Sequence, residues 1–351
     1  MKKSLLALAA LTAFAGVASA QSSVTLFGVV DLAARNVKES TGSLKSLSTN
    51  GMGSSRIGFR GVEDLGGGLR AGFWIEGDYS ADTGGGPAAA IGSGVNAQNW
   101  QRRSTVSLMG GFGEVRLGRD YTPDFWNHTV FDPFGTNGVA SSLNIWSTVG
   151  NAATTSVRAN NTIGYFLPGG LGGLYGQVQV AAGEGDVGNK HLGFRIGYAA
   201  GPVNVAFAYG KTDITESPVA TDWKRMNLGA SWNLGFMTLM GYYVNGDGSN
   251  NRELTQYLIG GVVPFGASQL KFSYSKSDAK GGTPAQNAQD ATQLGLGYLY
   301  SLSKRTTLYT HYSRVSNKSG ANYTASGSGP AAAHAAGQSS TGYEFGINHT
   351  F

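Results

Sequence analysis

The chain has no cysteine among its 351 residues, only nine prolines, and charged side chains at 13% of positions. Without cysteine it can form neither a disulfide scaffold nor a thiolate zinc site, and it has no cysteine nucleophile. Its charged share is about half of the usual share of about 25%. Low charge together with 11% aromatic residues argues against disorder. No Lys/Arg run reaches five residues, so nucleic acid is not an expected partner.

Long apolar runs are also missing, except at the start of the chain. Residues 1–20 read MKKSLLALAALTAFAGVASA, with Lys2 and Lys3 before an apolar stretch and a small-residue Ala-Ser-Ala ending at Ala20. This arrangement is typical of a signal peptide, and its apolar part is shorter than the roughly 20 residues of a membrane anchor. The sequence predicts removal of residues 1–20 and a single domain over residues 21–351.

Glycine is abundant, at 55 of 351 positions, which argues against a helical fold. Each interior glycine costs a helix about 1 kcal/mol, whereas strands and turns tolerate it better. Apolar and polar residues instead alternate with a period of two, which sorts side chains onto opposite faces of a sheet. The clearest segments are 24–35, 55–60, 69–79, 192–198, 203–209 and 225–234.

Short Gly-rich links alternate with long polar stretches. The short links lie near residues 65–68, 110–113, 168–173, 200–202, 234–236, 264–267 and 302–305. The long stretches lie near 38–51, 81–98, 120–156, 183–190, 212–221, 246–251, 279–289 and 317–340. These connections predict about 16 strands, and about 331 residues leave roughly 21 per strand and link, enough for membrane strands of about 9–11 residues.

Alternation alone fits both a soluble β-sandwich and a transmembrane barrel. Alternating short and long connections favour the barrel, and so do the aromatic residues near strand ends. The chain also ends on a strand, with Tyr343, Phe345 and Ile347 before the terminal Phe351. A barrel must pair this strand with the first, because an unpaired backbone group in lipid costs several kcal/mol. We therefore predict an all-β, 16-stranded antiparallel transmembrane β-barrel.

Five segments along the chain carry a family resemblance. They read SSVTLFGVVDLA, SSRIGFRGVEDLGGGLRAGFWIEGD, QRRSTVSLMGGFGEVRLGRDYTP, VRANNTIGYFLPGGLGG and STGYEFGINHTF. With them the chain resembles the general porins of Gram-negative outer membranes, most closely the betaproteobacterial type.

The resemblance implies a homotrimer in the cell outer membrane that passes small ions and hydrophilic solutes by diffusion. It also implies contact with outer-membrane lipid and lipopolysaccharide, and recognition of Phe351 by the barrel assembly machinery. In this family the third long loop folds into the lumen. Here that loop is expected at about residues 120–157, the longest connection, and loops of this length are usually functional.

The resemblance further implies a pore constriction, with basic wall residues set against acids on or near the inward loop. By motif its members are Arg56, Arg102, Arg158 and Glu76. Arg60, which shares a face with Arg56, and the loop residue Asp132 complete the expected set. Alternation supports most of this set, because Arg56 and Arg60 lie on the face opposite Ile57 and Phe59.

Arg102 fits the alternation less well, because it shares its parity with Val106 and Leu108. Either a bulge intervenes or Arg103 is the residue that faces the lumen, and the motif match favours Arg102. Arginine keeps its charge at physiological pH, and rings of Arg or Lys favour anions. We therefore expect anion selectivity, which the loop residues Asp120, Asp124 and Asp132 could offset.

Two other functions stay open at this point. One is a channel that prefers particular small anions, such as organic acids or phosphate, and the other is an adhesin or a barrel enzyme. The five histidines form no catalytic or metal-binding motif, so we expect no enzyme activity, no metal and no cofactor.

Overall fold

The structure is a computed structural model that describes residues 23–85, 100–146, 155–185, 190–216, 219–248, 251–318, 320–327 and 329–351. The predicted signal peptide at residues 1–20 lies outside these ranges, as does part of the third long loop, residues 147–154. Within the described chain no helix has the length and apolar character needed to cross a membrane.

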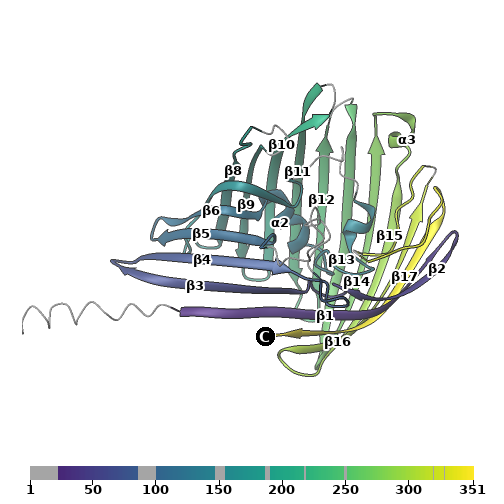
Figure 1. The fold of residues 1–351 in the computed structure, drawn as a ribbon, viewed down its shortest axis with the longest axis horizontal. Helices are drawn as coiled ribbons and strands as arrows, with labels where there is room; N and C mark the ends of the chain where they lie inside the picture. Colours follow the sequence, from purple (N-terminus) through teal and green to yellow (C-terminus); the bar gives the residue numbers. More distant parts are fainter. Residues whose placement is uncertain are drawn as a thin grey trace, which may run out of the picture.

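The described chain folds into one antiparallel sheet that curves around on itself (Figure 1). Its strands are β1 (Ser23–Glu39), β2 (Gly42–Thr49), β3 (Arg56–Gly66), β4 (Leu69–Asp78), β5 (Arg103–Gly110), β6 (Gly113–Tyr121), β7 (Arg158–Phe166), β8 (Leu174–Ala181), β9 (His191–Ala200), β10 (Val203–Glu216), β11 (Val219–Asn233), β12 (Thr238–Asp247), β13 (Glu253–Phe265), β14 (Ser268–Lys280), β15 (Ala291–Ser301), β16 (Thr306–Asn317) and β17 (Ser339–Thr350).

These strand segments make sixteen wall strands, because β2 and β3 pair with successive parts of β1. The irregular stretch between β2 and β3 is held by Asp31, whose carboxylate accepts hydrogen bonds from the backbone N–H groups of Gly51 (2.7 Å), Met52 (3.1 Å) and Gly53 (3.0 Å). β1 also pairs with β17, which closes the sheet. The predicted 16-stranded antiparallel barrel is confirmed.

The closing seam ends at the terminal residue. Gly28 and Phe351 exchange backbone hydrogen bonds of 3.0 and 3.1 Å, directly beyond the β1–β17 ladder. A Cβ atom on Gly28 would lie 2.2 Å from the Phe351 ring, so glycine is required where the terminal ring crosses the first strand. The last strand is therefore paired along its whole length, as a barrel in lipid requires.

The two faces of the wall have opposite character. In β17, Tyr343, Phe345 and Ile347 are exposed on the outside, whereas Glu344 and Asn348, which alternate with them, are buried. Outward apolar and inward polar side chains are the pattern of a barrel with lipid outside and a polar interior.

Short and long connections alternate as expected, but two stretches read as loops are mostly strand. β1 and β2 occupy most of residues 38–51, and β10 and β11 extend into residues 212–221. Beside this stretch the two strands carry charged side chains on the outer face. Lys211, for example, pairs with Asp222 on the neighbouring strand at 2.8 Å. Polarity therefore marks the end of the apolar belt, not the end of the strand.

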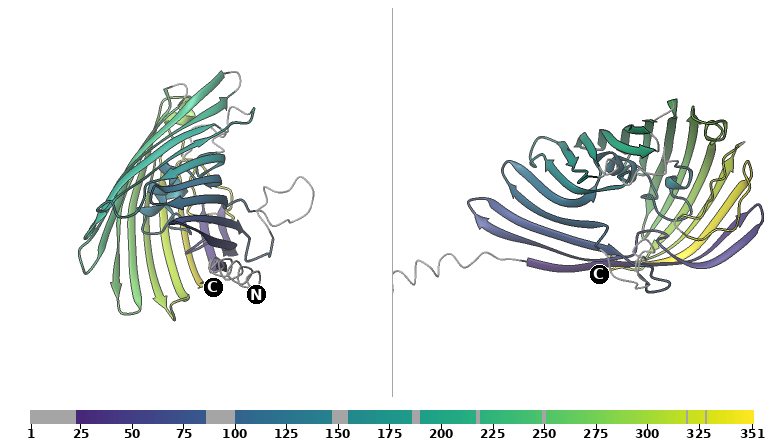
Figure 2. Two further views of the ribbon diagram at one scale, coloured as in Figure 1. Left: turned by 90° about the vertical axis from the view of Figure 1, so that its left-hand side faces the viewer. Right: turned by 45° about the horizontal axis from the view of Figure 1, so that its top comes forward.

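The third long loop contains α2 (Pro123–Val130) and the 3-10 helix η2 (Ser142–Ile145), while α3 (Pro284–Asn287) lies in the connection between β14 and β15. The right-hand view of Figure 2 shows the strands curving around a space in which helical segments lie. α2 contacts β8 to β11, and η2 contacts β14 and β15. The loop thus reaches two separate parts of the inner wall.

Candidate functional site

A cavity lies between one part of the wall and the third loop. It has a volume of about 600 Å³, and we call it the throat cavity. Its wall side comes from β3 to β7 and its other side from residues 125–143. Its lining includes all four of the arginines and acids placed there by motif: Arg56, Glu76, Arg102 and Arg158.

Glu76 is the centre of the polar contacts on the wall side. Its Oε1 lies 2.5 Å from Arg102 Nε and 3.7 Å from Arg56 Nε. Its Oε2 accepts a hydrogen bond of 3.1 Å from the indole Nε1 of Trp74. One carboxylate thus orients two arginines and neutralises only one of their two charges.

The structure answers the question about Arg102 and Arg103, because both line the throat cavity. β5 begins at Arg103, so the alternation of the strand does not apply to Arg102, which precedes it. Arg103 lies 4.5 Å above the Trp74 ring and 3.9 Å from Asp120. Sequence reasoning treated the two arginines as alternatives, whereas the strand boundary lets both contribute.

Arg158 is the least neutralised of the four arginines that line the throat cavity. Its guanidinium carbon lies 4.2 Å from the centre of the Tyr121 ring. Within the described ranges it forms no ion pair, and its buried Nε has no hydrogen-bond partner. A stacked guanidinium keeps its N–H edge free for an anion.

The charges around the throat cavity do not cancel. Its lining contains four arginines, at positions 56, 102, 103 and 158, and two carboxylates, Glu76 and Asp120, which gives 4 − 2 = +2. The loop side presents neutral polar groups instead, from Thr129, Thr136 and Asn137. The excess charge therefore comes from the wall alone.

Of the three acids expected to offset this charge, only Asp120 lines the throat cavity, and the structure places it on β6 of the wall. Asp124 and Asp132 do not offset the charge. Asp124 forms a buried ion pair with Arg225 on β11, away from the throat. Asp132 is fully buried and accepts hydrogen bonds from Ser142 Oγ (2.6 Å) and the Phe134 N–H (2.8 Å). Burial raises the pKa of Asp132 despite these hydrogen bonds. The structure therefore places Asp132 in the fold of the loop and not at the cavity.

The loop is held to the wall by side chains from strands far apart in sequence. Asn127 donates to the carbonyl of Ala206 on β10 at 2.8 Å, and Gln256 on β13 donates to the carbonyl of Ser142 at 2.9 Å. Phe131 packs against the wall beside Gly229, where a Cβ atom would lie 2.0 Å from its ring. These contacts fix the distance between the loop and the wall.

His128 lies inside this anchoring contact and does not add charge to it. Its ring stacks on Trp146 at 4.7 Å, and its Nε2 lies 3.1 Å from Ser142 Oγ. Burial lowers the pKa of His128 to about 3, so its ring is neutral near pH 7. The described residues contain no cluster of His, Cys, Asp and Glu that could hold a metal ion.

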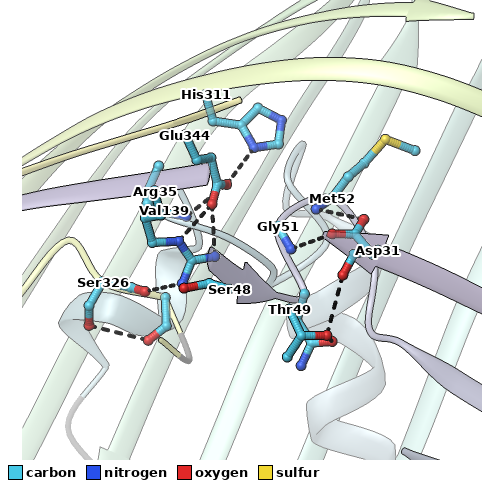
Figure 3. Close-up of polar contacts among 12 residues, drawn as sticks. Asp31, Arg35, Ser48, Thr49, Gly51, Met52, Val139, His311, Ser326 and Glu344 are labelled. Atoms are coloured by element: carbon cyan, nitrogen blue, oxygen red, sulfur yellow. Dashed lines mark hydrogen bonds and ion pairs between the residues drawn. The ribbon is translucent and has the colours of Figure 1, made fainter. Parts of the chain in front are cut away.

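A buried polar network ties the loop to the closing seam, and sequence reasoning missed it (Figure 3). Arg35 on β1 pairs with Glu344 on β17 at 2.7 Å, and His311 Nδ1 lies 2.9 Å from the same carboxylate. The N–H of Val139 in the loop donates to Glu344 at 3.2 Å. Alternation puts Arg35 on the inner face, but it gives no sign of a partner more than 300 positions away.

Arg60 does not reach the throat cavity. It lines a second cavity toward the short turns, together with Arg103 and Arg116. Its guanidinium lies over the rings of Phe27 (5.3 Å) and Trp74 (5.0 Å). The predicted set thus divides into four residues at the throat, one in the neighbouring cavity and one, Asp132, inside the loop.

Comparison with known proteins gives a consistent result. Residues 7–320 match the model of a family described as Gram-negative porin. The chain is 38% identical to outer membrane porin protein 32 of Delftia acidovorans, with 100% of both chains covered. It is 28% identical to an outer membrane porin protein of Bordetella pertussis, over 90% of this chain and 95% of that one.

A solved structure matches the architecture closely. An anion-selective porin from Comamonas acidovorans superposes with a TM-score of 0.84 at 35% sequence identity, covering 94% of this chain and 100% of that one. The closed barrel with alternating faces and the full-length similarity point to the same place in the cell, the outer membrane. The chain belongs to the Gram-negative porin family.

Proposed function

We propose that this porin is an anion-selective channel whose selectivity arises at the throat cavity. The observation that carries the proposal is the excess of four wall arginines over two carboxylates, opposite a neutral loop surface. A narrow passage with low-dielectric walls focuses the field of such charges and raises the local concentration of counter-ions. The anion selectivity of the similar Comamonas acidovorans porin agrees with this proposal.

Within this proposal the residues have separate roles. Arg56, Arg102, Arg103 and Arg158 attract the passing anion, and Glu76 holds Arg102 and Arg56 in place. Arg60 attracts anions in the second cavity, on the side of the short turns. Asp132 fixes the shape of the loop from within. Solutes cross by diffusion, and the chain carries out no catalysis and needs no cofactor.

The test is the reversal potential of the purified protein in a planar lipid bilayer under a KCl gradient. Chloride should permeate better than potassium. A preference for potassium would contradict the assignment of the throat arginines as the selecting groups.

A second candidate is a channel that prefers one class of small anion, such as organic acids or phosphate. The unpaired guanidinium edge of Arg158 favours it, because arginine binds carboxylate and phosphate in a bidentate manner. Saturation of the single-channel current by one such anion at low concentration would support this candidate over general diffusion.

Assembly belongs to the same proposal. We propose that residues 1–20 direct export and are removed, and that residues 21–351 form one barrel domain with the loop at about 120–157 narrowing its lumen. We further propose a homotrimer surrounded by outer-membrane lipid and lipopolysaccharide, assembled by machinery that recognises Phe351. Mass spectrometry of the native protein would give both the N-terminal residue and the number of subunits.

A further inference from the structure

The second cavity has a volume of about 380 Å³ and adjoins the throat cavity on the side of the short turns. Trp74 and Arg103 line both cavities, so a solute that passes the throat reaches the second cavity next. A volume of this size falls in the range of about 300–1,000 Å³ that is usual for small-molecule sites. We call this space the lower cavity.

Arg60 brings an unneutralised charge to the lower cavity. In the part of the chain that the structure describes, it forms neither an ion pair nor a hydrogen bond. Its neighbours differ, because Arg116 pairs with Glu114 (2.8 Å) and Arg103 approaches Asp120. Arg60 is held instead by its contacts with the Phe27 and Trp74 rings. Its five N–H groups therefore remain available to a ligand.

Apolar groups lie beside this charge. The cavity lining includes the ring of Trp74 and the side chains of Val62 and Met109. Aromatic rings attract other rings in edge-to-face or offset arrangements, and methionine sulfur also makes favourable contacts with rings. A plain inorganic anion would use the arginine and make no contact with these apolar groups.

We propose that the lower cavity binds organic monoanions that carry an aromatic ring. The carboxylate lies on Arg60, which offers it two parallel N–H donors, and the ring packs against Trp74 and Met109. The site rests on the proposed function, because the ligand must enter an anion-conducting lumen. It adds a ligand class that chloride selectivity alone does not define.

The test compares benzoate with acetate as inhibitors of the chloride current through the channel in a planar bilayer. Benzoate should reduce the current in a saturable manner at concentrations where acetate has little effect. Arg60→Gln should weaken the apparent affinity for benzoate about tenfold or more, the usual cost of losing a hydrogen bond to a charged group. Trp74→Leu should weaken it about fivefold, the scale of one aromatic contact.

The matched control is Arg305→Gln, which removes the same charge at an exposed position in the turn between β15 and β16. This variant should bind benzoate like the unmodified protein. Heat-dependent migration on a gel shows that each variant is folded before it is tested.

Equal inhibition by benzoate and acetate, or undiminished benzoate affinity in both cavity variants, would overturn the proposal. The KCl reversal potential of the same channels separates this failure from a failure of the proposed function. Chloride preference without benzoate binding rejects only the lower-cavity site, whereas potassium preference rejects the anion-selective throat.

Discussion

Removing the charge of Arg158 is the most direct test of the throat. The substitution Arg158→Gln lowers the net charge of the throat lining from +2 to +1 and leaves every ion pair of Glu76 in place. Arg158 is suited to this test because it contacts Tyr121 through its face and forms no ion pair with the described residues. The change therefore affects the passing ion more than the folded wall.

The size of the effect follows from Coulomb's law. An ion about 5 Å from a unit charge in water gains or loses about 0.8 kcal/mol. Chloride loses this attraction and potassium loses the same repulsion, so the preference changes by about 1.6 kcal/mol. Screening over half of the roughly 10 Å Debye length at 0.1 M salt reduces the change to about 1 kcal/mol. The chloride-to-potassium permeability ratio should fall about fivefold.

The measurement is the reversal potential under a KCl gradient at low ionic strength, repeated near 1 M salt. The fivefold fall should nearly vanish at high salt, where the Debye length is about 3 Å. Arg305→Gln, with the same change in total charge, should leave the ratio unchanged. An Arg158→Gln channel with an unaltered or higher preference for chloride would refute the reasoning.

Three further predictions follow from the same geometry. Glu76→Gln raises the net charge of the throat lining to +3 and should increase chloride preference in reversal-potential measurements; a decrease would mean that Glu76 acts mainly by positioning Arg102. Gly229→Val should displace Phe131 and change the single-channel conductance, because even a Cβ atom would lie 2.0 Å from the ring, whereas Ala230→Val on the exposed outer face should not. Between pH 5 and pH 8 the contribution of His128 to selectivity should be constant, because burial lowers its pKa to about 3; a titration step lost in His128→Gln would contradict this.

The wall could be predicted from the sequence because its signal is local. A period of two assigns each side chain to one face from its immediate neighbours, and the seam needs only the two ends of the chain. The predicted loops were wrong where polar residues, read as a loop, lie on a strand instead. Near residues 212–221, polar side chains such as Lys211 and Asp222 lie on strands above the apolar belt, and their polarity resembled that of a loop.

The throat residues were predictable for a different reason. Arg56, Glu76 and Arg158 lie on or directly at strands, so alternation and motif gave the same face. For Arg102 and Arg103 the two sources disagreed, because alternation holds only inside a strand and β5 begins between them. Knowing the boundary to one residue would have been necessary to see that both arginines reach the cavity.

The loop was the part that local reasoning could not reach. Its position depends on partners more than fifty positions away, such as Asn127 with Ala206 and Ser142 with Gln256. Alternation says nothing about a segment with no regular period. The number of acids on the loop therefore suggested that they offset the charge of the arginines. The contacts that the acids actually make could not be known from the sequence.

Those contacts explain why the wall alone determines the charge of the throat. The loop is fixed to the wall both by fully buried apolar side chains, such as Phe131 and Ile145, and by strong polar contacts. Asp124 forms an ion pair with Arg225, and Asp132 accepts hydrogen bonds from Ser142 and Phe134. An acid used as an anchor is lost as a selecting group, because its field is cancelled or buried. In the proposed channel the loop therefore narrows the passage, while the wall arginines determine the sign of the charge that the passing ion meets.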